Sequence, residues 1–317
     1  MRPALSVLLL TTLIGAGQGL FIAIAGTETL QVLRAEPAQS LGALPVAGSV
    51  VSLLLCALGL VASFFHLGHP ERAWRTATCW RTSWLSREVI VLPLLMAVIA
   101  LYGASHWLVP GDSQMGLGLL GIVLSLALYL CTGMIYAVVK AIREWATPIT
   151  VINFTLMGIA SGFTLAAALA AISAPALTSG FAIWAAWLTL IAALGRFSAL
   201  RRNTRIVPAT TPQSAIGVRH PRVVQRSQGA MGGSFNTREF FHGKSPEFAL
   251  AMARAFPVVA FLIPLILLLA VYSSTTGLGA LAAWLAFAVQ FAGLLIERWV
   301  FFAQANHTQN LYYRTVG

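Results

Sequence analysis

The sequence predicts an all-α polytopic membrane protein with eight transmembrane helices and both termini in the cytoplasm. Of its 317 residues, 58% are hydrophobic and only 9% are charged, whereas a soluble domain carries about 25% charged residues. Eight segments are apolar over the roughly 20 residues that a helix needs to cross a bilayer. The basic residues gather on one side of the resulting topology, so we interpret the net charge of +11 as membrane topology rather than as nucleic-acid binding.

The eight predicted spans follow one another along a single membrane domain, residues 1–317. The first begins just after Arg2, and within it Ala23-Ile24-Ala25, before Gly26, resembles a signal-peptide cleavage site. Its apolar run exceeds the roughly 7–15 residues of a signal peptide, so we interpret it as an uncleaved span. Proline and glycine separate the segments. Their approximate bounds are 4–30, 45–67, 88–109, 115–139, 149–173, 180–200, 249–272 and 278–302.

Charge sorting fixes the predicted orientation. With eight spans, all 20 Lys and Arg residues except Arg34 fall on the side of the N-terminus. Cytoplasmic loops are enriched in Lys and Arg, so this side is predicted to be the cytoplasm. The chain is accordingly predicted to lie in a bacterial inner membrane.

The connection 201–247 is predicted to be a long basic cytoplasmic loop. A loop of this length is usually functional or disordered. Its later part is rich in aromatic residues and glycine, which favours an ordered segment that packs on a partner or on other cytoplasmic connections. The alternative is a basic loop that lies on anionic lipid. Its basic residues are Arg201, Arg202, Arg205, Arg219, Arg222, Arg226, Arg238 and Lys244.

Small residues at helical spacing predict close helix packing. Gly15 and Gly19 form a G-x-x-x-G motif in the first span, and Gly158 and Gly162 repeat it in the fifth. Gln18 lies inside the first motif. An amide within a span needs a partner, which is either another helix or a bound ligand.

No metal site is predicted within this chain. The three cysteines, Cys56, Cys79 and Cys131, are far apart and form no C-x-x-C pair, so neither an iron–sulfur cluster nor structural zinc is supported. We interpret them as buried, inert thiols. His66 and His106 lie at opposite ends of their spans, so no histidine pair shares a depth suited to haem.

The segment from Phe64 to Ile90 concentrates polar chemistry at a predicted membrane edge. It holds two histidines, two glutamates, four arginines and three tryptophans. His66 near the end of the second span and Glu88 at the start of the third are expected to lie close together. Such a pair exchanges protons with the cytoplasm while facing lipid, as two-electron, two-proton chemistry on a quinone requires. The alternative reading of the arginines and tryptophans is an interfacial belt.

The last span carries Glu297 and Arg298 near the same membrane face. Neighbouring residues do not face each other on a helix, so these two are expected to need separate partners. A transporter is the alternative from a different class, and it predicts repeats and polar groups near the midplane. The sequence shows no convincing repeat, and its polar chemistry gathers at one face, which favours a docking anchor.

These residues also resemble a known family. The stretches His66–Pro70, Arg72–Trp74 and Ser86–Glu88 are similar to the membrane anchor subunits of dimethyl sulfoxide reductase and its relatives, and residues 232–242 and 297–299 resemble one branch of that family. The resemblance implies an eight-span anchor without haem that binds ubiquinone or menaquinone. It also implies docking of an iron–sulfur subunit, which connects the anchor to a molybdopterin catalytic subunit in a heterotrimer.

The resemblance assigns site residues by position. His66 matches the family's quinol-site histidine and Glu88 a glutamate linked to the same site, and both are expected to be catalytic. The predicted quinone-binding residues are His66, Glu88, Arg72, Arg87 and Gln18. The predicted partner-docking residues are Arg75, Arg81, Arg219, Arg222 and Arg238.

The predicted orientation favours one branch of this anchor family over another. The best-known dimethyl sulfoxide reductase anchors meet their partners in the periplasm, whereas charge sorting places the His66 face in the cytoplasm. This chain therefore resembles the anchor of a cytoplasm-facing sulfite dehydrogenase, which passes electrons from sulfite to quinone. The alternative is an anchor of a dimethyl sulfoxide (or other S- or N-oxide) reductase that oxidises menaquinol.

Overall fold

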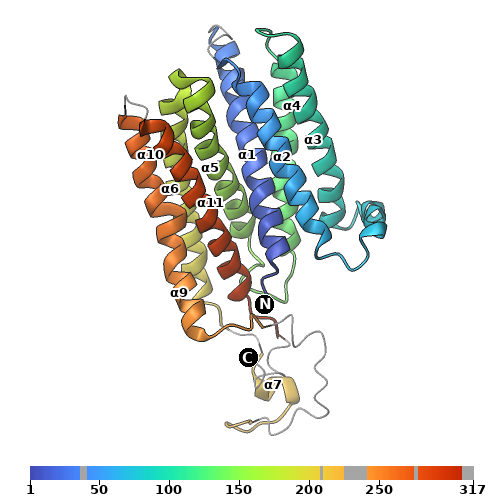
Figure 1. Ribbon diagram of the computed structural model, residues 1–317. Helices are drawn as coiled ribbons and strands as arrows, with labels where there is room; N and C mark the ends of the chain where they lie inside the picture. The colour runs from blue at the N-terminus through green and yellow to red at the C-terminus, as the bar shows by residue number, and fades with distance from the viewer. Residues whose placement is uncertain (36–40, 208–209, 225–240, 275–277, 309–317) are drawn as a thin grey trace.

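The computed structural model describes residues 1–35, 41–207, 210–224, 241–274 and 278–308. Within them, eight helical segments are long and apolar enough to cross a membrane, which confirms the predicted number of spans. They form one bundle (Figure 1). Their bounds are α1 Leu5–Leu33, α2 Leu44–Phe64, α3 Trp84–Leu108, α4 Met115–Ala137, α5 Pro148–Ser173, α6 Thr178–Asn203 after the short 3₁₀ turn η3 Pro175–Leu177, the segment α9 Pro246–Pro257, η4 Val258–Leu262 and α10 Ile263–Ser273, and α11 Leu278–Ala303.

The seventh segment is helical throughout but irregular in its middle. Pro257 has no backbone N–H to donate into the helix, and the chain passes through one π-helical stretch, η4, directly after it. A π-bulge of this kind absorbs a local break without ending a helix. Gly293 of α11 faces this stretch, where a Cβ atom would meet the backbone of Ala260.

Helices α1 and α5 form the centre of the bundle. They are the most buried of the eight spans, and they pack against each other. A Cβ atom on Gly19 would overlap the backbone at Gly158, and one on Gly162 would overlap the backbone at Gly19. Both glycine motifs therefore take part in close helix packing, as their spacing predicts, and they pack on each other.

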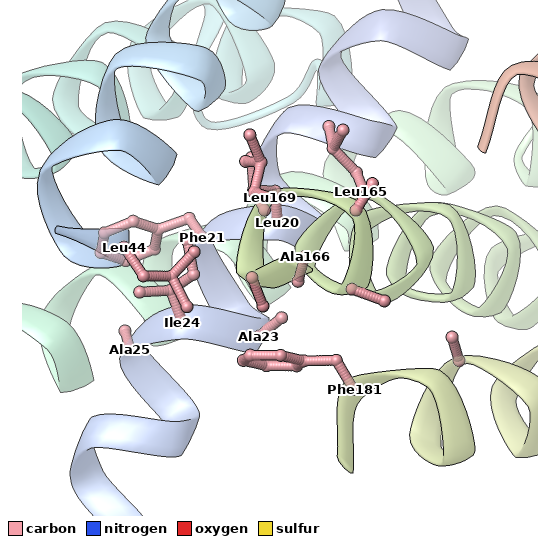
Figure 2. Close-up of a cluster of buried hydrophobic side chains, with 14 of the residues drawn as sticks. Leu20, Phe21, Ala23, Ile24, Ala25, Leu44, Leu165, Ala166, Leu169 and Phe181 are labelled. Carbon is pink, nitrogen blue, oxygen red and sulfur yellow. The ribbon is translucent and has the colours of Figure 1, made fainter. Parts of the chain in front are cut away.

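A cluster of apolar side chains lies next to this glycine contact in the core of the bundle. Figure 2 shows Leu20 of α1 beside Leu169 and Leu165 of α5, and Ile24 of α1 beside Leu44 of α2. Phe181 of α6 belongs to the same cluster. All are buried. Close packing of this kind, rather than exclusion of water, holds helices together inside lipid.

Two ends of the bundle matter for function. We call the end at which α1 begins the N-terminal end; α2, α4, α6 and α11 finish there, and α3 and α5 start there (Figure 1). A short 3₁₀ helix, η2 Pro70–Cys79, and a short helix, α7 Pro212–Ile216, also lie at this end.

The opposite end of the bundle holds a buried polar cluster that sequence reasoning missed. Glu28 of α1 is 1% exposed. Its carboxylate accepts hydrogen bonds from Tyr102 Oη at 2.6 Å and from the backbone N–H of Gln114 at 2.7 Å. His106 Nε2 lies 3.3 Å from the same carboxylate. The expectation that ionisable groups gather at one face only is therefore wrong.

Candidate functional site

A small cavity opens between five helices in the half of the bundle nearest the N-terminal end. Its volume is about 20 Å³, which is room for about one water molecule. Helices α1, α3, α4, α5 and α11 each contribute to it. Its lining residues are Leu10, Thr11, Thr12, Ile14, Gly15, Gln18, Glu88, Tyr129, Thr132, Phe154, Met157, Gly158, Ser161, Leu294 and Arg298.

Glu88 reaches this cavity from the second turn of α3. That helix begins earlier than predicted, because the side chain of Ser83 accepts a hydrogen bond from the backbone N–H of Ser86 and caps it at Trp84. Thr132 of α4 donates its hydroxyl hydrogen bond to the Glu88 carboxylate. The hydroxyl fixes one carboxylate oxygen, and the carboxyl group remains part of the cavity wall.

Gln18 reaches the same cavity from α1. Its side chain is 2% exposed, and its Oε1 atom has no hydrogen-bond partner among the described residues. Buried polar atoms are nearly always paired, so an unpaired oxygen in a cavity wall is available to a bound group. Tyr129 closes the wall beside it by donating a hydrogen bond of 2.7 Å to the backbone oxygen of Gly15.

Arg298 of α11 is a cavity residue that sequence reasoning did not place in the site. Its guanidinium carbon lies 3.6 Å from the ring centroid of Phe154. Its Nε lies 3.4 Å from Glu297 Oε2, and Arg196 Nε of α6 lies 2.6 Å from Glu297 Oε1. Glu297 and Arg298 thus have separate partners, Arg196 and Phe154, as expected, but the two neighbours also pair with each other, which was not expected.

Arg87 occupies a different position from its neighbour Glu88. Its guanidinium donates hydrogen bonds of 2.9 Å to the backbone oxygens of Trp80 and Arg81. It also lies 4.2 Å from the ring centroid of Trp84. Arg87 therefore ties the connection before α3 to the start of that helix, and it does not line the cavity.

His66 and Arg72 lie on the surface at the N-terminal end. Because α2 ends at Phe64, His66 falls beyond the helix and is exposed. Desolvation by neighbouring atoms lowers the pKa of His66, which favours the neutral imidazole. Arg72 Nε lies 3.7 Å from Glu71. Between His66 and Glu88, both in the described part of the chain, the structure has no hydrogen bond or ion pair.

An exposed basic and aromatic surface lies beside these residues. We call it the η2 surface and define it by Trp74, Arg75, Trp80 and Arg81. Trp74 is 68% exposed and Trp80 is 52% exposed, and each carries an arginine over its ring, at 5.6 and 5.3 Å. The segment projects sideways from the bundle (Figure 1).

The remaining predicted docking residues follow α6. Arg219 and Arg222 are exposed close to α7, at the same end of the bundle as the η2 surface. Arg238 lies outside the described residues. Exposed cations at this end present positive charge to any acidic partner.

The described residues contain no group of three or more His, Cys, Asp or Glu side chains that could hold a metal ion. Cys56 and Cys131 are buried and free, as expected. Cys79 is exposed at the end of η2, so the interpretation of all three cysteines as buried is wrong for this one.

The chain has clear relatives. Residues 1–304 match the family described as the DMSO reductase anchor subunit (DmsC). The chain is also 51% identical to a subunit of the sulfite dehydrogenase of Allochromatium vinosum over 329 aligned residues, which cover 100% of both chains. The eight apolar helices and these full-length matches lead to one conclusion: the chain belongs to the DMSO reductase anchor subunit family.

Proposed function

We propose that this chain is the quinone-reactive anchor of a sulfite-oxidising complex. It is a multi-pass membrane anchor of an oxidoreductase by family, and its 51% identical relative is named for sulfite dehydrogenase. One observation supports the quinone site above others: Gln18 and Glu88, two predicted quinone-binding residues from different helices, line the same cavity.

The groups around the cavity suit quinone chemistry. Sulfite takes an oxygen from water and releases two electrons and two protons, and a quinone that accepts all four becomes a quinol. Glu88 supplies a carboxyl group for proton transfer, and Gln18 supplies an unpaired oxygen to a ring hydroxyl. A neutral His66 at the surface exchanges protons with water. The free volume accepts a ring oxygen, and entry of the whole ring requires lining side chains to move.

Partners supply the other cofactors in this proposal. A molybdopterin subunit oxidises sulfite, and an iron–sulfur subunit passes the electrons to the quinone that this chain binds. The η2 surface, together with Arg219 and Arg222, forms the docking face of the anchor. Exposed arginines and tryptophans of this kind are enriched where proteins bind partners.

The docking face is cytoplasmic in this proposal. All Lys and Arg residues except Arg34 fall on the N-terminal side of the spans, and the η2 surface lies at that end. A green fluorescent protein fused after Gly317 is therefore expected to fluoresce in cells, and alkaline phosphatase at the same position is expected to be inactive. An active phosphatase fusion would reverse the orientation and favour a periplasmic docking face.

A comparison of two preparations tests the function. The complex is prepared with and without this chain, and sulfite-dependent reduction is measured with a ubiquinone analogue and with a soluble dye. We expect dye reduction in both preparations and quinone reduction only when the chain is present. Quinone reduction at an equal rate without the chain would refute the proposal.

The family description supports a second candidate function. In an S-oxide reductase complex the same cavity would oxidise menaquinol, and electrons would flow in the opposite direction. The same preparation supplied with menaquinol and dimethyl sulfoxide distinguishes the two. We expect no turnover with this pair of substrates.

A further inference from the structure

We propose that Arg298 is the cationic group that binds a ring oxygen of the quinone in this cavity. The inference rests on the proposed function and adds to it a substrate-binding residue from the last helix. Arg298 is 4% exposed and lines the cavity together with Gln18 and Glu88. The three residues come from α11, α1 and α3, so they surround the free space from different sides.

Charge balance around Arg298 favours a ligand oxygen that becomes negative. Arg196 and Arg298 share the single carboxylate of Glu297, so this buried cluster has an excess of one positive charge when all three are ionised. An unbalanced charge inside a membrane protein is costly and marks a functional group. A quinone oxygen gains electron density on reduction, and a nearby guanidinium stabilises that density.

The hydrogen bonds of Arg298 leave capacity for a stronger acceptor. Its Nη2 donates to the thioether sulfur of Met157 at 3.4 Å, and a thioether is a weak acceptor. A ring oxygen is a better acceptor, and a charged donor strengthens the bond further. Meanwhile Glu297 Oε2 lies 3.4 Å from Nε, and the ring centroid of Phe154 lies 3.6 Å from the guanidinium carbon, so contacts on two sides restrict the position of the group.

Arg196 provides the matched comparison. It pairs with the same carboxylate from the other side, it is equally buried, and it does not line the cavity. Arg196→Met and Arg298→Met therefore remove the same charge from the same cluster. Only the second removes a group from the cavity wall. A difference between them reports contact with the ligand rather than the loss of an ion pair.

Binding of a fluorescent hydroxyquinoline N-oxide, a quinone analogue, to membranes that carry the whole complex tests the inference. We expect Arg298→Met to weaken binding by about tenfold or more, because hydrogen bonds to charged groups contribute that much. Arg196→Met should stay within about twofold of the unchanged protein. Arg298→Lys keeps the positive charge but loses the planar, forked set of guanidinium donors, so its affinity for the analogue should lie between those of the two methionine variants.

The outcomes separate the inference from the proposed function. Subunit assembly and sulfite-dependent dye reduction identify variants that fold, and Arg298→Lys replaces Arg298→Met if the latter does not assemble. Equal weakening by the Arg196 and Arg298 variants would overturn the inference in favour of a structural pair. Normal binding by both Arg298 variants would overturn it while leaving the quinone site intact. No binding of the analogue to the unchanged complex would overturn the proposed function itself.

Discussion

Glu88→Gln is expected to reduce sulfite-dependent quinone turnover by at least about 100-fold, the range in which general acid–base catalysis contributes. The amide keeps the size of the side chain and still accepts the Thr132 hydrogen bond, but it transfers no proton. The measurement is quinone reduction by the complex, with soluble dye reduction in parallel. Dye reduction should not change, because the dye takes its electrons from the partner subunits.

The control for this variant is Thr132→Val. It removes the hydroxyl that donates to Glu88 and leaves the carboxyl group in place. Its effect on quinone turnover should be much smaller than that of Glu88→Gln. A normal quinone rate in Glu88→Gln would exclude Glu88 from proton transfer.

His66→Ala is the companion variant. The resemblance predicts that it also abolishes quinone turnover while assembly and dye reduction persist. The structure places His66 on the surface, outside the cavity wall, so its expected role is proton exchange with water. A normal quinone rate in His66→Ala would remove this residue from the site and leave the case for Glu88 unchanged.

Gly19→Ala is expected to have the second large effect, a destabilisation of about 1–3 kcal/mol from overpacking. The added Cβ would overlap the backbone of Gly158 in α5, and neither backbone can shift without moving a central helix. The measurement is the unfolding temperature of the detergent-solubilised chain. The chain is heated in steps, and size-exclusion chromatography measures the folded fraction that remains after each step.

Gly26→Ala provides a matched control in the same helix. A Cβ atom at Gly26 would meet nothing within 4 Å, and alanine favours a helix more than glycine does. Its unfolding temperature should equal or exceed that of the unchanged chain. Equal unfolding temperatures for the Gly19 and Gly26 variants would show that α1 and α5 do not pack through their glycines.

Features that local pattern determines are predictable from the sequence. Span number follows from apolar length, and close packing at the two glycine motifs follows from their spacing, but only the structure shows that α1 and α5 are each other's partner. Gln18 stands out because an amide is costly inside lipid. Glu88 stands out because it follows a polar connection and opens a span.

The missed features depend on contacts between distant parts of the chain. Glu28 pairs with Tyr102 and His106 of another helix, and Glu297 pairs with Arg196 from the sixth span. No local pattern specifies such partners. The expectation that adjacent helical residues face apart also fails at Glu297 and Arg298, because their long side chains bend toward each other and the Glu297 carboxylate pairs with Arg298 as well as with Arg196.

The hydropathy-based prediction places His66 too deep in the membrane, because it extends the second span beyond the true end of the helix. Counting apolar residues extends the second span to residue 67, whereas α2 ends at Phe64 and the chain turns toward Pro70. The start of α3 shifts the other way, because Ser83 caps the helix before the apolar run begins. Hydropathy locates spans well, and caps and turns decide where they end.

The central claim is that quinone reacts in the cavity shared by Gln18, Glu88 and Arg298. The most direct measurement is cross-linking of a photoreactive ubiquinone analogue to the intact complex, with the labelled residues identified by mass spectrometry. We predict labels on the lining of that cavity, in α1, α5 and α11 near the N-terminal end, and competition by unlabelled ubiquinone. The account would be contradicted if the labels that unlabelled ubiquinone suppresses were confined to the opposite end of the bundle, around Glu28 and His106.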